Sequence, residues 1–177
     1  SELSKSEFEP IAFELNFGED GQMPAVPISG SRMQAQLRGF VDRVDAWCDG
    51  YQSFLRVVDY KTGKKDFDYC DVFNGIGLQM LLYMFALRSS GEENLGDHPI
   101  AAGVQYFPAR FPFLTADGKL SPEDAQKERN SQIKRRGLIL MDDDVLTAMD
   151  PEEDMKRLSC RRKADGSVTG DVAEPAQ

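Results

Sequence analysis

Three charged residues stand in two short β-branched runs, and their spacing suits the hydrolysis of a phosphodiester bond. Residues 39–45 read GFVDRVD, and residues 57–63 read VVDYKTG. Side chains alternate between the two faces of a strand, so Asp59 and Lys61 point to the same side. If the two runs pair, Asp42 can join them. Two carboxylates and one ammonium then meet at the end of an apolar sheet, which is costly unless they coordinate a ligand.

The carboxylates of Asp42 and Asp59 are suitable ligands for Mg²⁺. This ion takes oxygen ligands at about 2.0–2.1 Å, commonly one or two carboxylates together with water and substrate phosphate. The competing interpretation is a strand-end salt bridge between Lys61 and one acid. A salt bridge explains one ion pair but neither the second acid nor the spacing. The sequence therefore predicts a metal-dependent phosphodiesterase site.

Two strands must position these residues, and we predict them over residues 37–48 and 54–61. The Asp-Gly turn between them favours an antiparallel hairpin, which would pair the strands directly. Residues 8–17 alternate apolar and polar side chains and predict a half-buried strand. Its buried face is expected to hold Ile11, Phe13, Leu15 and Phe17.

One long helix is predicted from about Asp71 to Ser89, with Asp71 as its N-cap. Gln79 and Tyr83 lie four residues apart and hence on one face of this helix. A further strand is predicted over residues 99–107, which are rich in β-branched and aromatic side chains.

The ordered motifs at residues 39–45, 59–63 and 77–83 (GLQMLLY) resemble those of the PD-(D/E)XK nuclease superfamily. More narrowly, they resemble the RecB-like nuclease domain in the AddB/RexB-type component of ATP-dependent helicase-nucleases. The resemblance is clearest over residues 37–87. It implies an α/β, restriction-endonuclease-like fold, in which a mixed central sheet is flanked by helices.

The resemblance also implies roles for the charged residues. Asp42, Asp59 and the backbone carbonyl of Tyr60 would bind Mg²⁺, with Mn²⁺ as a substitute. Lys61 would orient or help deprotonate the attacking water and offset charge in the transition state.

Other motif residues take supporting roles by the same resemblance. Gln79 and Tyr83 would line the site and touch DNA, the alternative being a core tyrosine with a paired amide. Thr62 could contact phosphate. For Arg43 and Asp45, which face away from Asp42, an internal ion pair and a functional role remain open.

RecB-like nucleases place a further acidic or histidine ligand on a helix ahead of the first strand. We expect this chain to begin at or after that helix. Glu9 and Glu14 are the nearest substitutes, and for Glu14 a solvated strand position is favoured over a role in the site.

The resemblance implies an Mg²⁺-dependent DNA exonuclease within a bacterial helicase-nuclease that acts in double-strand-break repair and recombination. Single-stranded ends would be delivered by a partner subunit of the AddA type in the bacterial cytoplasm. Two alternatives remain. One is a nuclease-fold DNA-binding or scaffold module with weak activity, and the other is a Cas4-like or phage-type recombination exonuclease.

The length of 177 residues predicts a single domain, which the resemblance implies is a nuclease domain. Its polar start without an initiator Met indicates a piece cut from a larger protein. Its core is expected over residues 8–110, a polar insertion over 111–136, and a C-terminal segment over 137–177, frayed from Asp165 onward. No run of about 18 apolar residues occurs, so no membrane span is expected. The three cysteines form no C-x-x-C pair, so neither a zinc site nor a disulfide framework is expected. AddB-type proteins usually carry an iron–sulfur cluster with cysteines on both sides of the nuclease core, but this sequence has no matching group of cysteines near its C-terminus, so no such cluster is expected.

The net charge of −9 has the wrong sign for a protein that binds DNA alone. Without a basic stripe, the isolated chain is expected to bind DNA weakly and with a gentle salt dependence. Residues 134–136 are the most basic spot, and a solvated loop and a phosphate contact are equally favoured for them.

Overall fold

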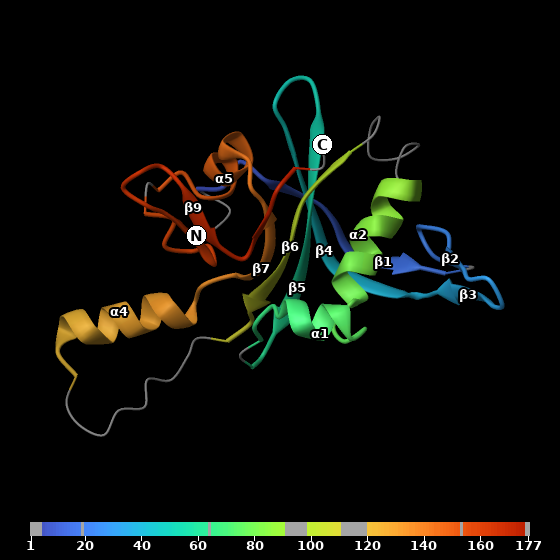
Figure 1. The fold of residues 1–177 in the computed structure, drawn as a ribbon, viewed down its shortest axis with the longest axis horizontal. Coiled ribbons are helices and arrows are strands. Elements are labelled where there is room, and N and C mark those ends of the chain that lie inside the picture. The colour runs from blue at the N-terminus through green and yellow to red at the C-terminus, as the bar shows by residue number, and fades with distance from the viewer. Residues whose placement is uncertain are drawn as a thin grey trace.

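The computed structural model describes residues 5–18, 20–63, 65–90, 99–110, 120–152 and 154–175. At its centre lies a six-stranded mixed sheet in the order β1-β4-β5-β6-β7-β10 (Figure 1). Its strands are β1 (Glu9–Phe17), β4 (Gly39–Cys48), β5 (Ser53–Lys61), β6 (Ile100–Pro108), β7 (Arg136–Leu140) and β10 (Val172–Ala173). Two small hairpins lie outside it, formed by β2 (Val26–Ser29) with β3 (Gln34–Leu37) and by β8 (Cys160–Arg162) with β9 (Val168–Gly170). The helices are α1 (Tyr69–Phe73), α2 (Gln79–Ser90), α4 (Pro122–Gln132) and α5 (Asp143–Met149).

The predicted hairpin is confirmed, because β4 and β5 pair antiparallel. Its turn is held by the Asp49 carboxylate, which accepts hydrogen bonds from the backbone N–H groups of Tyr51 and Gln52 at 2.7 and 2.8 Å. Strands β5 and β6 pair parallel, so the chain between them must cross over the sheet, and this crossover carries α1 and α2. The α/β fold with a mixed sheet flanked by helices is confirmed.

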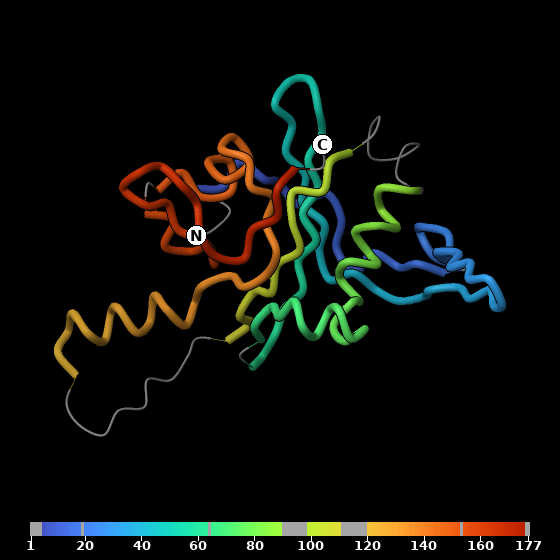
Figure 2. The backbone as a smooth tube through the Cα atoms, viewed as in Figure 1, coloured from blue at the N-terminus to red at the C-terminus, as the bar shows by residue number. Residues whose placement is uncertain are grey.

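Two apolar clusters cover the two faces of the sheet. Helix α2 packs on one face through Met80, Tyr83, Met84 and Leu87, against side chains of β4, β5 and β6. Helix α5 packs on the other face through Val145, Leu146 and Met149. The backbone trace shows α2 and α5 on opposite sides of the central strands (Figure 2). None of the helices in the described ranges is long and apolar enough to cross a membrane.

The single long helix predicted from Asp71 is wrong, because the chain forms two helices there. Helix α1 begins after the N-cap Asp68, whose side chain accepts from the Cys70 N–H at 2.7 Å. Gly75 and Gly77 then adopt φ values of +79° and +71°. This left-handed conformation suits glycine and interrupts the helix before Gln79.

The alternation predicted for β1 is only half right. Leu15 and Phe17 are buried, but Ile11 and Phe13 are 45% and 60% exposed. The pairing of β1 with β4 shifts between Pro10 and Ala12, and Glu14 has a left-handed φ of 49°. Because strand alternation holds only for regular backbone, these irregularities break the pattern on which the prediction depended.

The C-terminal segment is more ordered than predicted. Residues from Asp165 include β9 and β10, and β10 forms the edge of the central sheet. The backbone N–H groups of Ile139 and Met141 donate to the carbonyls of Asp171 and Ala173 at 3.0 and 2.8 Å. In the polar segment, α4 begins after its N-cap Ser121, with Pro122 in the first turn, whereas residues 111–119 lie outside the described residues.

A cluster of buried charge lies on the α5 side of the sheet. The Asp45 carboxylate is fully buried. Its Oδ2 accepts hydrogen bonds from Arg56 Nε at 2.9 Å and from Arg56 Nη2 at 2.5 Å. It also binds Arg43, with Nε to Oδ1 at 2.7 Å. The Phe107 ring lies about 5 Å from the guanidinium carbons of Arg43 and Arg135. We call Arg43, Asp45, Arg56, Phe107 and Arg135 the buried arginine cluster.

Asp45→Asn should destabilise the fold by about 3–5 kcal/mol, because it leaves buried guanidinium groups without their counter-charge. The measurement is urea unfolding, with the exposed Asp20→Asn as the matched control, expected to stay within about 0.5 kcal/mol of the wild type. A loss below about 1 kcal/mol for Asp45→Asn would contradict this interpretation of the cluster.

Candidate active site

Asp42, Asp59 and Lys61 lie on the face of the sheet that α2 covers, where β5 ends. Asp59 and Lys61 alternate with Tyr60, whose hydroxyl is on the opposite face. The Lys61 ammonium binds Asp59 Oδ2 at 2.5 Å, with Asp59 19% and Lys61 40% exposed. The charges of Asp59 and Asp42 both act on Lys61, so the two strands bring the three residues into one neighbourhood.

The electrostatics of this neighbourhood favour a protonated lysine. The hydrogen bond to Asp59 raises the pKa of Lys61, against a smaller lowering by burial. Tyr106 on β6 lies beside the pair, with the Lys61 Nζ 5.9 Å from its ring centroid. Burial and the Asp59 charge raise the pKa of the Tyr106 hydroxyl. Lys61 therefore supplies positive charge, and Tyr106 stays neutral.

The Asp42 side chain forms a hydrogen bond to the backbone of β5. Its Oδ2 accepts a hydrogen bond from the Tyr60 N–H at 2.8 Å. The Tyr60 hydroxyl in turn accepts from Arg43 Nη1 at 2.7 Å. For Arg43 and Asp45 the structure selects the internal ion pair, and this pair lies directly behind the strand ends that carry Asp42 and Asp59.

Gln79 and Tyr83 lie on the first turns of α2 and form a pair. The Gln79 amide donates to the Tyr83 hydroxyl at 2.9 Å. Tyr83 is buried, and its ring stacks on Phe17 with centroids 5.6 Å apart. A Cβ atom at Gly39, the first residue of β4, would collide with the Tyr83 hydroxyl. Glycine at this position therefore lets α2 approach the strand that carries Asp42.

The donors that could hold a metal are oxygen atoms. Asp42 and Asp59 offer two carboxylates, and the contacts found for them in the described ranges, with the Tyr60 N–H and with Lys61, each use Oδ2. Two carboxylates fit Mg²⁺, which takes its remaining ligands from water and phosphate. In the described part of the chain, no group of three or more His, Cys, Asp or Glu side chains is arranged to hold a metal. Glu14 falls opposite Asp42 between the paired residues Phe13–Arg43 and Leu15–Val41, but its left-handed backbone interrupts the regular strand.

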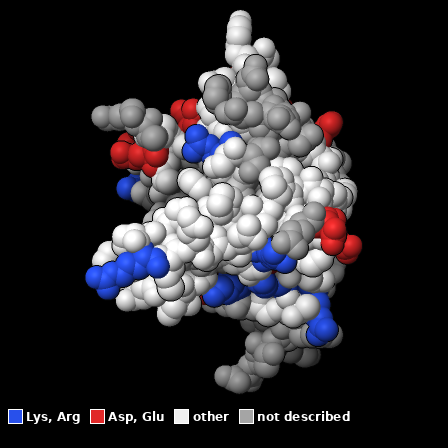
Figure 3. All heavy atoms as spheres, turned by 90° about the vertical axis from the view of Figure 1, so that its right-hand side faces the viewer, with Lys and Arg blue, Asp and Glu red and all other residues white. Residues whose placement is uncertain are grey.

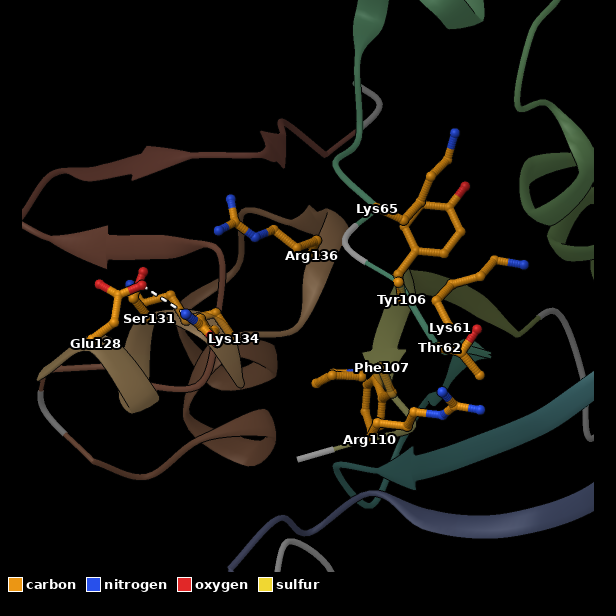
Figure 4. Close-up of a pocket in the computed structure, with 13 residues that line it drawn as sticks. Lys61, Thr62, Lys65, Tyr106, Phe107, Arg110, Glu128, Ser131, Lys134 and Arg136 are labelled. Atoms are coloured by element: carbon orange, nitrogen blue, oxygen red, sulfur yellow. Dashed lines mark hydrogen bonds between the residues drawn. The ribbon is translucent and has the colours of Figure 1, made fainter. Parts of the chain in front are cut away.

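A pocket that the sequence did not reveal adjoins Lys61. It has a volume of about 460 Å³ and lies between α4 and the ends of β5 and β6 (Figure 4). We call it the basic pocket, because its charged lining residues are Lys61, Lys65, Arg110, Lys134, Arg136 and Glu128. Thr62 also lines it. Arg110 and Lys65 stand in no recognisable motif, so only the fold could identify them.

Positive charge is gathered unevenly on this acidic chain. On the face that Figure 3 shows, most visible Lys and Arg side chains lie in the lower half, towards the end of the molecule where β5 and β6 finish in Figure 1. The structure thus gathers cations that are scattered in the sequence, as the lining of the basic pocket also shows. Of residues 134–136, Lys134 and Arg136 line the basic pocket, whereas Arg135 is buried.

A mixed sheet flanked by helices, with two acids and a lysine where two neighbouring strands meet, defines the restriction-endonuclease-like class of nuclease folds. The family model described as the PD-(D/E)XK nuclease superfamily matches residues 1–162. The chain belongs to this superfamily, as its motifs predicted.

Curated relatives include proteins named as the B component of an ATP-dependent helicase/deoxyribonuclease. The protein from Acetivibrio thermocellus is 37% identical over 151 residues, which are 85% of this chain and 13% of the relative. Those from Clostridium novyi and Moorella thermoacetica are 34% and 35% identical over 94% and 93% of this chain, and 15% and 14% of their own lengths. The chain thus spans about one seventh of the relatives that it matches.

Gly39→Ala should destabilise the protein by about 1–3 kcal/mol, because the added methyl group displaces the Tyr83 hydroxyl. Combining it with Tyr83→Phe removes the oxygen that the methyl group meets, so the double variant should lose less than the sum of the two single changes. Urea unfolding of the four proteins measures this coupling. Additive losses would show that the two residues do not touch.

Proposed function

We propose that this chain is the nuclease domain of an AddB/RexB-type helicase-nuclease component and hydrolyses DNA phosphodiester bonds with Mg²⁺. The observation that carries the proposal is the position of Asp42, Asp59 and Lys61 on one face of a paired β4–β5 sheet in a PD-(D/E)XK fold. The names of the relatives support DNA as the substrate and a helicase activity within the same complex.

Each residue of the site takes a defined part in this proposal. Asp42, Asp59 and the Tyr60 carbonyl hold Mg²⁺, which when bound would polarise the phosphate and lower the pKa of a nearby water. Lys61, kept protonated by Asp59, offsets the negative charge that develops on the phosphoryl oxygens. The Gln79–Tyr83 pair fixes the start of α2 beside them.

The finer assignment follows the same family. We expect exonuclease action on single-stranded ends delivered by a motor subunit of the AddA type, in repair and recombination of double-strand breaks in the bacterial cytoplasm. A tethered motor raises the local concentration of the strand, so the nuclease domain can work with modest affinity of its own. The nuclease-fold scaffold without activity is less well supported, since it gives no reason for an acid pair with a lysine.

Asp42→Asn and Asp59→Asn should each reduce cleavage below detection with little change in folding stability, because each removes one of two like charges that repel. The assay uses linear single- and double-stranded DNA with Mg²⁺ and the exposed Asp20→Asn as the matched control. Near-wild-type cleavage by either variant at saturating Mg²⁺ would remove that carboxylate from the site.

Lys61→Ala should slow cleavage by roughly 10²–10⁴-fold while leaving Mg²⁺ binding intact, as expected for one electrostatic or acid–base group. Single-turnover rates and calorimetric Mg²⁺ titration separate the two effects. If Mg²⁺ binding is lost and no separate rate effect is found, Lys61 is a structural counter-ion of Asp59.

A further inference from the structure

The basic pocket concentrates positive charge in a chain whose net charge is −9. Five cationic side chains line it, against the single carboxylate of Glu128. That carboxylate already accepts a hydrogen bond from the Gln132 amide at 2.8 Å. In Figure 4, Lys61, Thr62 and Arg110 lie on one side of the pocket, and Lys134 with Glu128 lies across from them.

Not all of this charge is neutralised by neighbours. Lys61 pairs with Asp59, and Arg136 pairs with Asp66 at 2.9 Å. Within the described ranges, Lys65, Arg110 and Lys134 form no ion pair. Three partly or fully exposed cations around one hollow repel each other, and an anion bound between them would relieve that repulsion.

The size and the walls of the pocket define the ligand. The pocket volume of about 460 Å³ lies in the range for one small ligand. The pocket can therefore hold about one nucleotide of a flexible single strand. Tyr106 and Phe107 line it but are only 7% and 4% exposed, and Phe107 is already packed against guanidinium groups. Without open aromatic faces for base stacking, recognition must depend on phosphate charge rather than on base identity.

We propose that the basic pocket binds backbone phosphates of single-stranded DNA, next to the scissile phosphate that Mg²⁺ at Asp42 and Asp59 would bind. Lys65, Arg110 and Lys134 contact the strand, and Lys61 and Thr62 border both the pocket and the candidate active site. The proposal rests on the proposed function, because it supplies that site with its strand. It assigns the approach of the strand to the gap between α4 and the ends of β5 and β6.

The test is fluorescence anisotropy of labelled oligothymidylate with the chain in EDTA, so that binding is read without cleavage. Lys65→Ala, Arg110→Ala and Lys134→Ala should each weaken binding severalfold. Each should also reduce the slope of log affinity against log salt by about 0.7, the value for one phosphate contact on a single strand. The triple variant should reduce the slope by about 2, three times that value.

Lys127→Ala and Arg129→Ala are matched controls, because they remove the same charge from α4 outside the pocket lining. They should bind like the wild type, and circular dichroism should show all variants folded. Equal losses of DNA affinity in the control and pocket variants would overturn the assignment of binding to the pocket. Binding would then depend on overall charge. A persistent base preference, or equal affinity for a duplex of the same length, would overturn single-strand phosphate recognition.

Asp59→Asn separates this proposal from the proposed function. If Asp59→Asn binds the strand but does not cleave it in Mg²⁺, and the pocket variants lose binding, both proposals hold. If Asp59→Asn does not cleave but the pocket variants keep full affinity, only the pocket assignment fails. Absence of cleavage by the wild-type chain in Mg²⁺ would refute the proposed function, and the EDTA titrations would then decide whether the pocket binds DNA.

Discussion

The fully buried Asp45 carboxylate pairs with both Arg43 and Arg56 on the α5 side of the sheet, and the position of the site depends on these ion pairs. Arg56 is fully buried, a position that a guanidinium tolerates only when paired. The chain of contacts continues from Arg43 to the Tyr60 hydroxyl and from the Tyr60 N–H to Asp42. Removing charge on the far face of the sheet would therefore be felt at the face that carries the candidate metal ligands.

This arrangement explains why the motif at residues 39–45 has two acids separated by an arginine and a valine. Asp42 and Asp45 are three residues apart, so they point to opposite faces of β4. One acid is available for a ligand, and the other neutralises buried arginines. The residue type alone does not distinguish these roles, since both are aspartates beside arginine. Their partners do: Asp45 pairs with Arg43 and Arg56, whereas Asp42 accepts a hydrogen bond from the Tyr60 N–H near the end of β5.

Local patterns in the sequence were sufficient to predict the hairpin and the shared face of Asp59 and Lys61, because strand alternation and an Asp-Gly turn act over a few residues. The break between α1 and α2 was missed because hydrophobic periodicity continues across Gly75 and Gly77. Periodicity does not reveal the left-handed backbone that these two glycines adopt. The irregular backbone at Glu14 was missed for the same reason. The basic pocket brings together residues as far apart as Lys61 and Arg136, so only tertiary structure could reveal it.

The acidic net charge and a nucleic-acid substrate are compatible once charge is considered by position. The long-range field of a chain with net charge −9 opposes DNA, but screening limits that field to about 8–10 Å at physiological salt. Contacts inside a pocket act over shorter distances than this, so local cations outweigh remote acids once the strand is there. The repulsion between the acidic chain and DNA therefore slows association more than it weakens the bound complex. Delivery by a tethered motor would offset this slow association, which gives a physical reason why a nuclease domain of this kind can remain acidic.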